Sequence, residues 1–176
     1  MDRRQIATKL TLDLAEIELN LENFQKRLIL QKSIYLLQKA GVKLGYSYSW
    51  YLRGPYSRGL TSDAFDMKDE INTKYDDSVG WNLDDNSCSV IKNIQPLLTS
   101  APDGFPSEST TSEDQDFELA NWLELLASAH FLIDTSQVGK DNIEDIRIKL
   151  ESFDKEYNDV QICTALSSLK SYSLLS

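Results

Sequence analysis

The chain has 176 residues, of which 41% are hydrophobic, a composition that supports one folded domain and excludes global disorder. No apolar run reaches the roughly 20 residues that a membrane helix needs, and no apolar stretch of a signal peptide follows the charged start. We therefore expect a cytoplasmic protein without a membrane association. The formal net charge of −10 disfavours general binding to nucleic acid, because phosphate carries the same sign.

The charge is unevenly distributed. Residues 1–58 carry ten Lys and Arg against five Asp and Glu, whereas the remaining chain carries eight against 23. A basic face in the first third could bind phosphate or an acidic partner. Alternatively, the two parts complement each other inside the fold.

Two helices are expected before residue 41. The first follows Asp2, with Gln5 placed for a capping box. Its apolar residues at steps of three or four are Ile6, Leu10, Leu14, Ile17 and Leu21. The second begins after Asn23, a good N-cap, and is predicted to be central because residues 34–37 are apolar almost all round. Gly41 is suited to the positive φ that follows many helices.

Residues 46–52 alternate between large apolar and smaller polar side chains with a period of two, which predicts a half-buried strand. Gly54-Pro55 is expected to end this strand, and Ser57 to cap a third helix. The apolar stripe of that helix is Leu60, Ala64, Met67 and Ile71. A strand needs a hydrogen-bonding partner, and residues 79–83 are the predicted one. The result would be a small hairpin, which a winged-helix-like element would also contain.

The rest of the chain predicts further helices around an acidic loop. Ser87 is the expected cap of a short fourth helix. Residues 99–116 predict a loop or linker between a helical part, 1–98, and C-terminal helices, 117–176, that pack on the same domain. The expected later elements are a strong helix over 117–133, a helix opened by a capping box of Asp141 and Glu144, and a last helix containing Val160, Cys163, Leu166 and Leu169. The predicted fold is mainly α, a bundle of about six to seven helices with a small β-hairpin.

The sequence contains little that indicates catalysis. His130 is the single histidine and lies on an apolar helix side, so a core histidine is favoured over a general base. The acids Asp63, Asp66 and Glu70 share a helical face that is expected to be solvated rather than metal-binding. Cys88 and Cys163 have no metal or redox spacing. We therefore expect no enzyme, no cofactor and no metal.

The turn that runs from Arg53 to Arg58 is the main candidate for a binding site. Gly54 and Pro55 fix its backbone, and Tyr and Arg dominate binding hot spots. The candidate partner-binding residues are Tyr51, Arg53, Tyr56 and Arg58. Two interpretations stay open. The turn either presents these side chains to a partner or is a tight strand-to-helix turn whose tyrosine packs inward.

Three nearby segments resemble a known family. They are Leu-Gln-Lys-Ser-Ile-Tyr-Leu-Leu-Gln at 30–38, the glycine-bounded 41–45, and Tyr-Leu-Arg-Gly-Pro-Tyr-Ser at 51–57. They are similar to the Panacea antitoxin-type domains of prokaryotes, and nearer to relatives that contain Gly-Pro-Tyr-Ser. Those relatives also have a segment similar to 122–132. Ser33 stands where the Panacea pattern has Leu, and Tyr56-Ser57 replaces an aliphatic pair followed by proline. The resemblance implies a helical bundle with a small β element and, for Panacea domains, a non-enzymatic role in neutralising a toxin or in phage defence.

Two hypotheses on function follow. The first is a non-enzymatic protein-interaction module, an antitoxin-like or accessory subunit of a prokaryotic defence or toxin–antitoxin system. The second is a nucleic-acid-binding regulator that uses the basic first third of the chain. Its predicted phosphate contacts are Lys26, Arg27, Lys32, Arg53 and Arg58. The sequence leaves the identity of the partner and the oligomeric state open.

Overall fold

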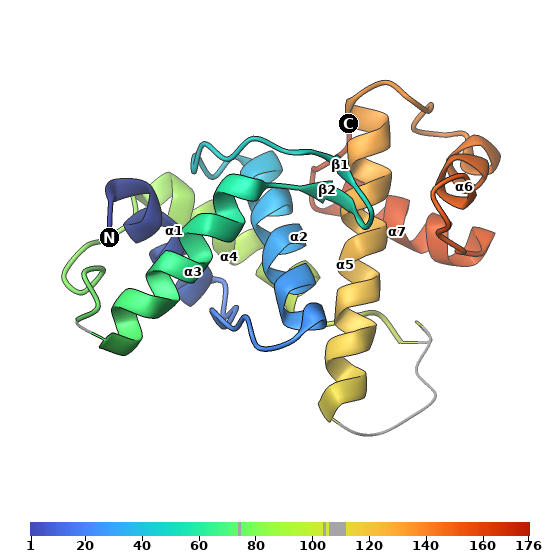
Figure 1. Ribbon diagram of the computed structural model, residues 1–176. Helices are drawn as coiled ribbons and strands as arrows, with labels where there is room; N and C mark the ends of the chain where they lie inside the picture. Colours follow the sequence, from blue (N-terminus) through green and yellow to red (C-terminus); the bar gives the residue numbers. More distant parts are fainter. Residues whose placement is uncertain (74, 104, 106–111) are drawn as a thin grey trace.

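The computed structural model describes residues 1–73, 75–103, 105 and 112–176 (Figure 1). Within these ranges it has seven helices and a two-stranded antiparallel hairpin, so the predicted mainly α class is confirmed. The elements are α1 (Arg3–Leu14), α2 (Phe24–Ala40), β1 (Ser49–Tyr51), β2 (Gly54–Tyr56), α3 (Arg58–Thr73), α4 (Asp85–Thr99), α5 (Ser112–Asp134), α6 (Ile143–Glu151) and α7 (Asp159–Ser171).

Helices α2 and α5 pack against each other in the middle of the molecule (Figure 1). Helices α1, α3 and α4 lie on one side of this pair, and α6 and α7 on the other. The hairpin crosses the pair, and β2 contacts both α2 and α5. The centre of the core is therefore made by side chains of α2 and α5, among them Ile34, Tyr35, Leu37, Leu123 and Leu126, all with 0% exposure.

The hairpin differs from the prediction in its pairing. Strand β1 pairs with β2, with Trp50 opposite Pro55, and not with residues 79–83. The chain reverses direction at Leu52-Arg53, so β1 ends at Tyr51, and Gly54 and Pro55 begin the second strand instead of ending the first. Gly54 adopts a φ of +85° directly after this turn. Proline is tolerated because this short ribbon has edges where no N–H is needed. Val79 and Trp81 are exposed and lie in a turn.

The first two helices begin as predicted. Asp2 and Gln5 form a capping box, and Asn23 accepts a hydrogen bond from the N–H of Lys26. The predicted apolar stripe of the first helix is wrong, because α1 ends at Leu14 and buries a mainly polar face. That face consists of Gln5, Thr8, Thr11 and Leu12. One reason is that the hydroxyl groups of Thr8 and Tyr46 are hydrogen-bonded at 2.9 Å, so a polar side chain is satisfied inside the fold.

Two of the later caps are shifted from their predicted positions. Asp84, rather than Ser87, caps α4, and Asn142, rather than Asp141, caps α6. The predicted buried face of the last helix is right for Leu166 and Leu169 and wrong for Val160, which is exposed. The buried residues of this helix are Ile162, Ala165, Leu166 and Leu169.

The acidic loop is shorter than predicted at its C-terminal end, because α5 begins at Ser112. The described part of the loop contributes to the core. The buried ring of Phe105 lies 5.4 Å from the ring of Trp122, centroid to centroid. Residues 104 and 106–111 of the predicted loop lie outside the described residues, and the proposed division of the chain at 99–116 stays a prediction.

Candidate functional site

Two glutamines of α2 hold the segment that carries the hairpin. The side-chain oxygen of Gln38 accepts from the N–H of Tyr46 at 2.8 Å, and its amide nitrogen donates to the carbonyl of Tyr46 at 2.9 Å. Gln31 does the same to Ser57, at 3.0 and 2.9 Å. Residues seven apart share one face of a helix, because seven residues make about two turns. Helix α2 therefore fixes both ends of 46–57.

The glycine and proline of the turn are also fixed from within the fold. The Lys32 ammonium donates to the carbonyl of Pro55 at 2.7 Å. A Cβ atom on Gly54 would lie 2.3 Å from the Ser128 Oγ, so only glycine fits where β2 crosses α5. Gly54, Pro55 and Ser57 are all buried. These residues of the family-like pattern thus have a structural role, whatever else the turn does.

The structure brings together three of the four predicted site residues. The rings of Tyr51 and Tyr56 pack with centroids 5.5 Å apart, and Tyr56 accepts a hydrogen bond from Thr61. Arg53, at the tip of the hairpin, has its side chain half exposed. Arg58 is exposed at the start of α3 and does not line the cavity that the other three share.

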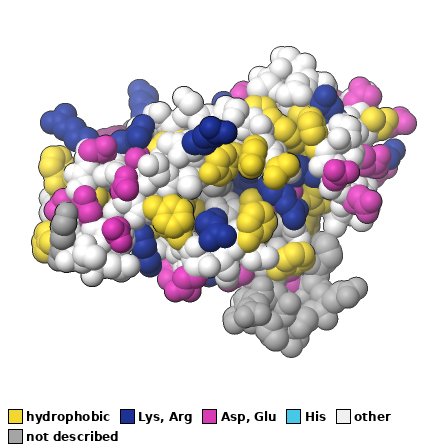
Figure 2. All heavy atoms as spheres, viewed as in Figure 1, with side chains coloured by type: hydrophobic (Ala, Val, Ile, Leu, Met, Phe, Trp, Pro, Cys, Tyr) yellow, Lys and Arg dark blue, Asp and Glu magenta, His cyan; other side chains and the backbone are white. Residues whose placement is uncertain are grey.

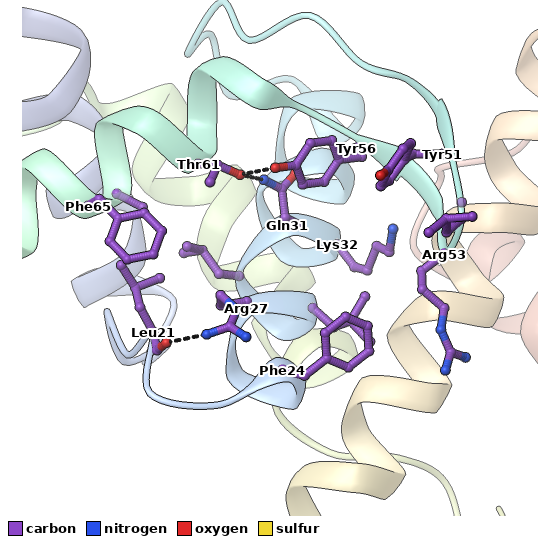
Figure 3. Close-up of a pocket in the computed structure, with 15 residues that line it drawn as sticks. Leu21, Phe24, Arg27, Gln31, Lys32, Tyr51, Arg53, Tyr56, Thr61 and Phe65 are labelled. Atoms are coloured by element: carbon purple, nitrogen blue, oxygen red, sulfur yellow. Dashed lines mark hydrogen bonds between the residues drawn. The ribbon is translucent and has the colours of Figure 1, made fainter.

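This cavity is an apolar groove of about 380 Å³ between α2, α3 and the hairpin (Figure 3). We call it the hairpin groove. Its lining residues are Leu21, Phe24, Arg27, Leu28, Leu30, Gln31, Lys32, Tyr51, Leu52, Arg53, Gly54, Tyr56, Thr61, Ala64 and Phe65. Four of its large apolar side chains are between 46% and 75% exposed, namely Phe24, Tyr51, Leu52 and Phe65. Contiguous exposed apolar patches of this kind often mark a binding site.

Sequence reasoning missed the contribution of Phe24 and Phe65 to this groove. Phe24 is the first residue of α2 and is exposed. Phe65 follows the buried Ala64 and lies off the predicted stripe of the third helix. A large apolar residue outside the stripe of an amphipathic helix was the available signal.

The groove is cationic as well as apolar. Arg27, Lys32 and Arg53 line it, and the described lining contains no Asp or Glu. Burial lowers the pKa of Lys32 to about 7, and the nearby carboxylate of Glu124 opposes that shift. Figure 2 shows hydrophobic and Lys or Arg side chains across the middle of this face, with acidic side chains gathered towards its two ends.

A buried ionic cluster lies behind the hairpin. Lys155 donates a hydrogen bond to one carboxylate oxygen of Glu124, and both side chains are almost completely buried. The guanidinium of Arg53 lies 3.5 Å from the other oxygen. Burial lowers the pKa of Lys155, although Glu124 opposes this. Arg53 therefore borders both the cluster and the hairpin groove, where its guanidinium lies 5.6 Å from the ring centroid of Phe24.

His130 occupies the core, as the favoured interpretation had it. Its Nδ1 pairs with the hydroxyl of Tyr35 at 2.8 Å, and its Nε2 lies 3.1 Å from the carbonyl of Leu174. A carbonyl only accepts, so Nε2 carries the hydrogen and Nδ1 accepts from Tyr35. Burial lowers the pKa of His130, which favours this neutral form. Both ring nitrogens are engaged, and the prediction had allowed for one.

The structure also places the acidic residues and cysteines that were considered for metal binding or redox chemistry. Asp63 is buried, which corrects the prediction of a solvated acidic face. It accepts from Arg4 at 2.8 Å and from the hydroxyl of Tyr46 at 2.9 Å. In the described ranges no three His, Cys, Asp or Glu side chains are grouped as metal ligands. Cys88 and Cys163 are free thiols.

Comparisons of the chain with models of protein families, with curated proteins and with solved structures give no match. Within the described parts of the chain, no helix has both the length and the apolar character needed to cross a membrane. The fold and the groove together define a mainly helical protein with an open, apolar and cation-lined groove beside a small hairpin.

Proposed function

We propose that the protein is a non-catalytic interaction module of the prokaryotic cytoplasm, and that a segment of a partner protein binds in the hairpin groove. The observation that carries the proposal is the exposure of Phe24, Tyr51, Leu52 and Phe65 around one continuous groove. When a partner covers large apolar side chains around an open groove, their removal from water favours binding. By its resemblance to the Panacea antitoxin-type domains, the partner is a toxin or a subunit of a defence complex.

The surroundings of the groove support binding rather than chemistry. Two of its polar members, Gln31 and Arg27, hold the fold. Gln31 bonds the main chain of Ser57, and Arg27 donates to the carbonyl of Leu21 at 2.8 Å. His130 lies in the core and does not line the groove. A rigid hairpin over a helix pair gives the pre-organised surface that lowers the entropic cost of association.

The alternative, a nucleic-acid-binding regulator, has less support. Lys32 is 1% exposed and bonds the Pro55 carbonyl, so it is not placed to contact phosphate. Lys26 forms an ion pair with Asp116 at 3.0 Å. A gel-shift titration at low salt tests this alternative, since phosphate contacts strengthen as salt falls.

Affinity purification of the tagged protein, expressed with its native gene neighbours, tests the main proposal. We expect Leu52→Ser and Phe65→Ser to lose a protein that the wild type retains. The matched control is Val79→Ser, because Val79 is exposed like Leu52 but lies outside the groove. Retention of every co-purifying protein by both groove variants would overturn the proposal.

A further inference from the structure

We propose that the segment bound in the hairpin groove is an acidic amphipathic peptide stretch whose apolar side chains fill the groove and whose carboxylate pairs with Arg53. This inference rests on the proposed function, in which the partner is a protein. It adds the chemistry by which that protein is recognised.

The charge of the groove contrasts with that of the chain. The protein has 28 Asp and Glu against 18 Lys and Arg, yet the described lining of the groove has three cationic residues and no carboxylate. An apolar partner with a cationic side chain would be repelled here, whereas a carboxylate is attracted. Charge complementarity therefore selects an acidic occupant.

Arg53 is placed to receive that carboxylate. Its only ion pair among the described residues is the one with Glu124, at 3.5 Å, which is longer than a good charge-assisted hydrogen bond. Glu124 already binds Lys155 through its other oxygen. The half-exposed guanidinium thus has N–H donors to spare at the edge of the groove, and arginine binds carboxylates in a two-pronged geometry.

Lys32 adds positive potential beneath the same end of the groove. An ammonium has three N–H donors, and the described residues provide one acceptor within hydrogen-bond distance, the carbonyl of Pro55. The charged groups that act on Lys32 come from three elements. They are Glu124 on α5, Lys155 before α7, and Arg53 in the hairpin. Two of these are cationic, so the cluster as a whole favours an additional anion.

The volume and lining of the groove suit a cluster of side chains from one peptide segment. Apolar side chains line α2, α3 and the hairpin tip, so they face an occupant from three directions (Figure 3). A helix or turn with two or three large apolar residues fills such a volume, and a carboxylate at the hairpin end then meets Arg53. This arrangement is the familiar helix-in-groove type of recognition.

Selection from a display library of random 16-residue peptides tests the inference. On the wild-type protein we expect peptides enriched in aromatic or leucine residues together with Asp or Glu. On the Arg53→Gln protein the apolar enrichment is expected to stay and the acidic enrichment to disappear. Apolar peptides without acidic enrichment on the wild type would overturn the inference and leave the proposed function standing.

A double-mutant cycle on one selected peptide sharpens the test. Replacing its Glu by Gln is expected to weaken binding to the wild type about tenfold, as for loss of one charge-assisted hydrogen bond. The same replacement is expected to have little effect on Arg53→Gln. Arg58→Gln is the matched charge control, because it removes the same charge from an exposed residue outside the groove. An equal loss on wild type and on Arg53→Gln would overturn the pairing.

The pH dependence gives a second readout. A bound carboxylate favours the charged form of Lys32, so we expect affinity to rise as the pH falls from 8.5 to 6, and Lys32→Met to flatten this rise.

A pair of dyes separates a peptide from a small amphipathic anion. Anilinonaphthalene sulfonate carries a negative charge, and N-phenyl-naphthylamine has a similar body without it. Saturable dye binding at the groove together with failure to select any peptide would overturn the peptide and favour a small anion.

Discussion

The side chain of Gln31 bonds both the N–H and the carbonyl of Ser57, at 3.0 and 2.9 Å, and so stands in for a neighbouring strand. The bonds join a buried position of α2 to the residue at which the hairpin ends and α3 begins. Gln38 forms the equivalent pair with Tyr46, at the other end of the segment. The hairpin groove therefore depends on two glutamines that themselves have a structural function.

Substitution of Gln31 is expected to be costly. We expect Gln31→Leu to lower the free energy of unfolding by about 1–3 kcal/mol, because the buried N–H of Ser57 would lose its partner, whereas the carbonyl of Ser57 keeps its bond from Thr61. Urea unfolding followed by circular dichroism measures the change. Gln25→Leu on the same helix is the control, since Leu and Gln have similar helix propensity and Gln25 is only half-buried. A similar loss in both variants would contradict the role of Gln31.

Position 54 requires glycine for two separate reasons, and variants can distinguish them. We expect Gly54→Ala to destabilise by about 2–4 kcal/mol, from a strained positive φ together with overpacking against Ser128. Gly80→Ala is expected to cost only about 1–2 kcal/mol, because Gly80 has a φ of +87° but no atom near its Cβ position.

The same pair of causes predicts a partial rescue. In the double variant Gly54→Ala with Ser128→Ala, the clash with the hydroxyl is removed while the strained φ stays. Thermal unfolding should place its stability between those of Gly54→Ala and the wild type. If the double variant is no more stable than Gly54→Ala, the contact with Ser128 is not the cause.

The carboxylate of Glu124 is expected to hold the buried ammonium of Lys155 in place. We expect Glu124→Gln to lower the free energy of unfolding by about 3–5 kcal/mol, because it leaves Lys155 charged and buried without compensation. Combining it with Lys155→Met should recover part of this loss. Chemical denaturation of the two single variants and the double variant measures the coupling, and additive losses would argue against the ion pair.

Acid should destabilise the fold through His130. Burial holds the pKa of His130 below its ordinary value of about 6.5, so below that pH the unfolded chain binds a proton that the folded chain resists. Stability is therefore lost as the pH falls from about 6.5 towards the lower folded pKa. Urea unfolding at a series of pH values measures this slope, and His130→Gln should reduce it. An unchanged slope in the variant would assign the acid sensitivity to other groups.

The sequence predicted elements better than it predicted contacts. Asp2 with Gln5 and Asn23 identified two helix starts, because capping depends on residues within one turn. The pairing of residues 46–52 with 79–83 was wrong, because the choice of strand partner depends on the reversal of the chain at Leu52-Arg53. Local signals also placed two caps close to the right residue, since several capping residues lie near Asp84 and near Asn142.

The sequence predicted only part of the candidate site, because it links residues that are close along the chain. Tyr51, Arg53 and Tyr56 are close in sequence and were predicted together, whereas Arg58 lies on the other side of the turn and outside the groove. Phe24 and Phe65 come from two different helices. No local pattern links them to the hairpin, because only the packing of α3 and the hairpin on α2 brings them to one surface.

By itself the sequence determined the mainly helical class, the starts of the first two helices and the positive φ of Gly41 and Gly54, since propensity, caps and glycine act within a few residues. The tertiary structure decided that Lys32, Glu124 and Lys155, far apart in the chain, share one buried cluster. It also decided which residues of the turn are buried and which are exposed. Gly54, Pro55 and Ser57 are buried against α2 and α5, while Tyr51 and Arg53 stay exposed at the groove. Burial and long-range packing make that division, and neither is encoded in the local order of residues.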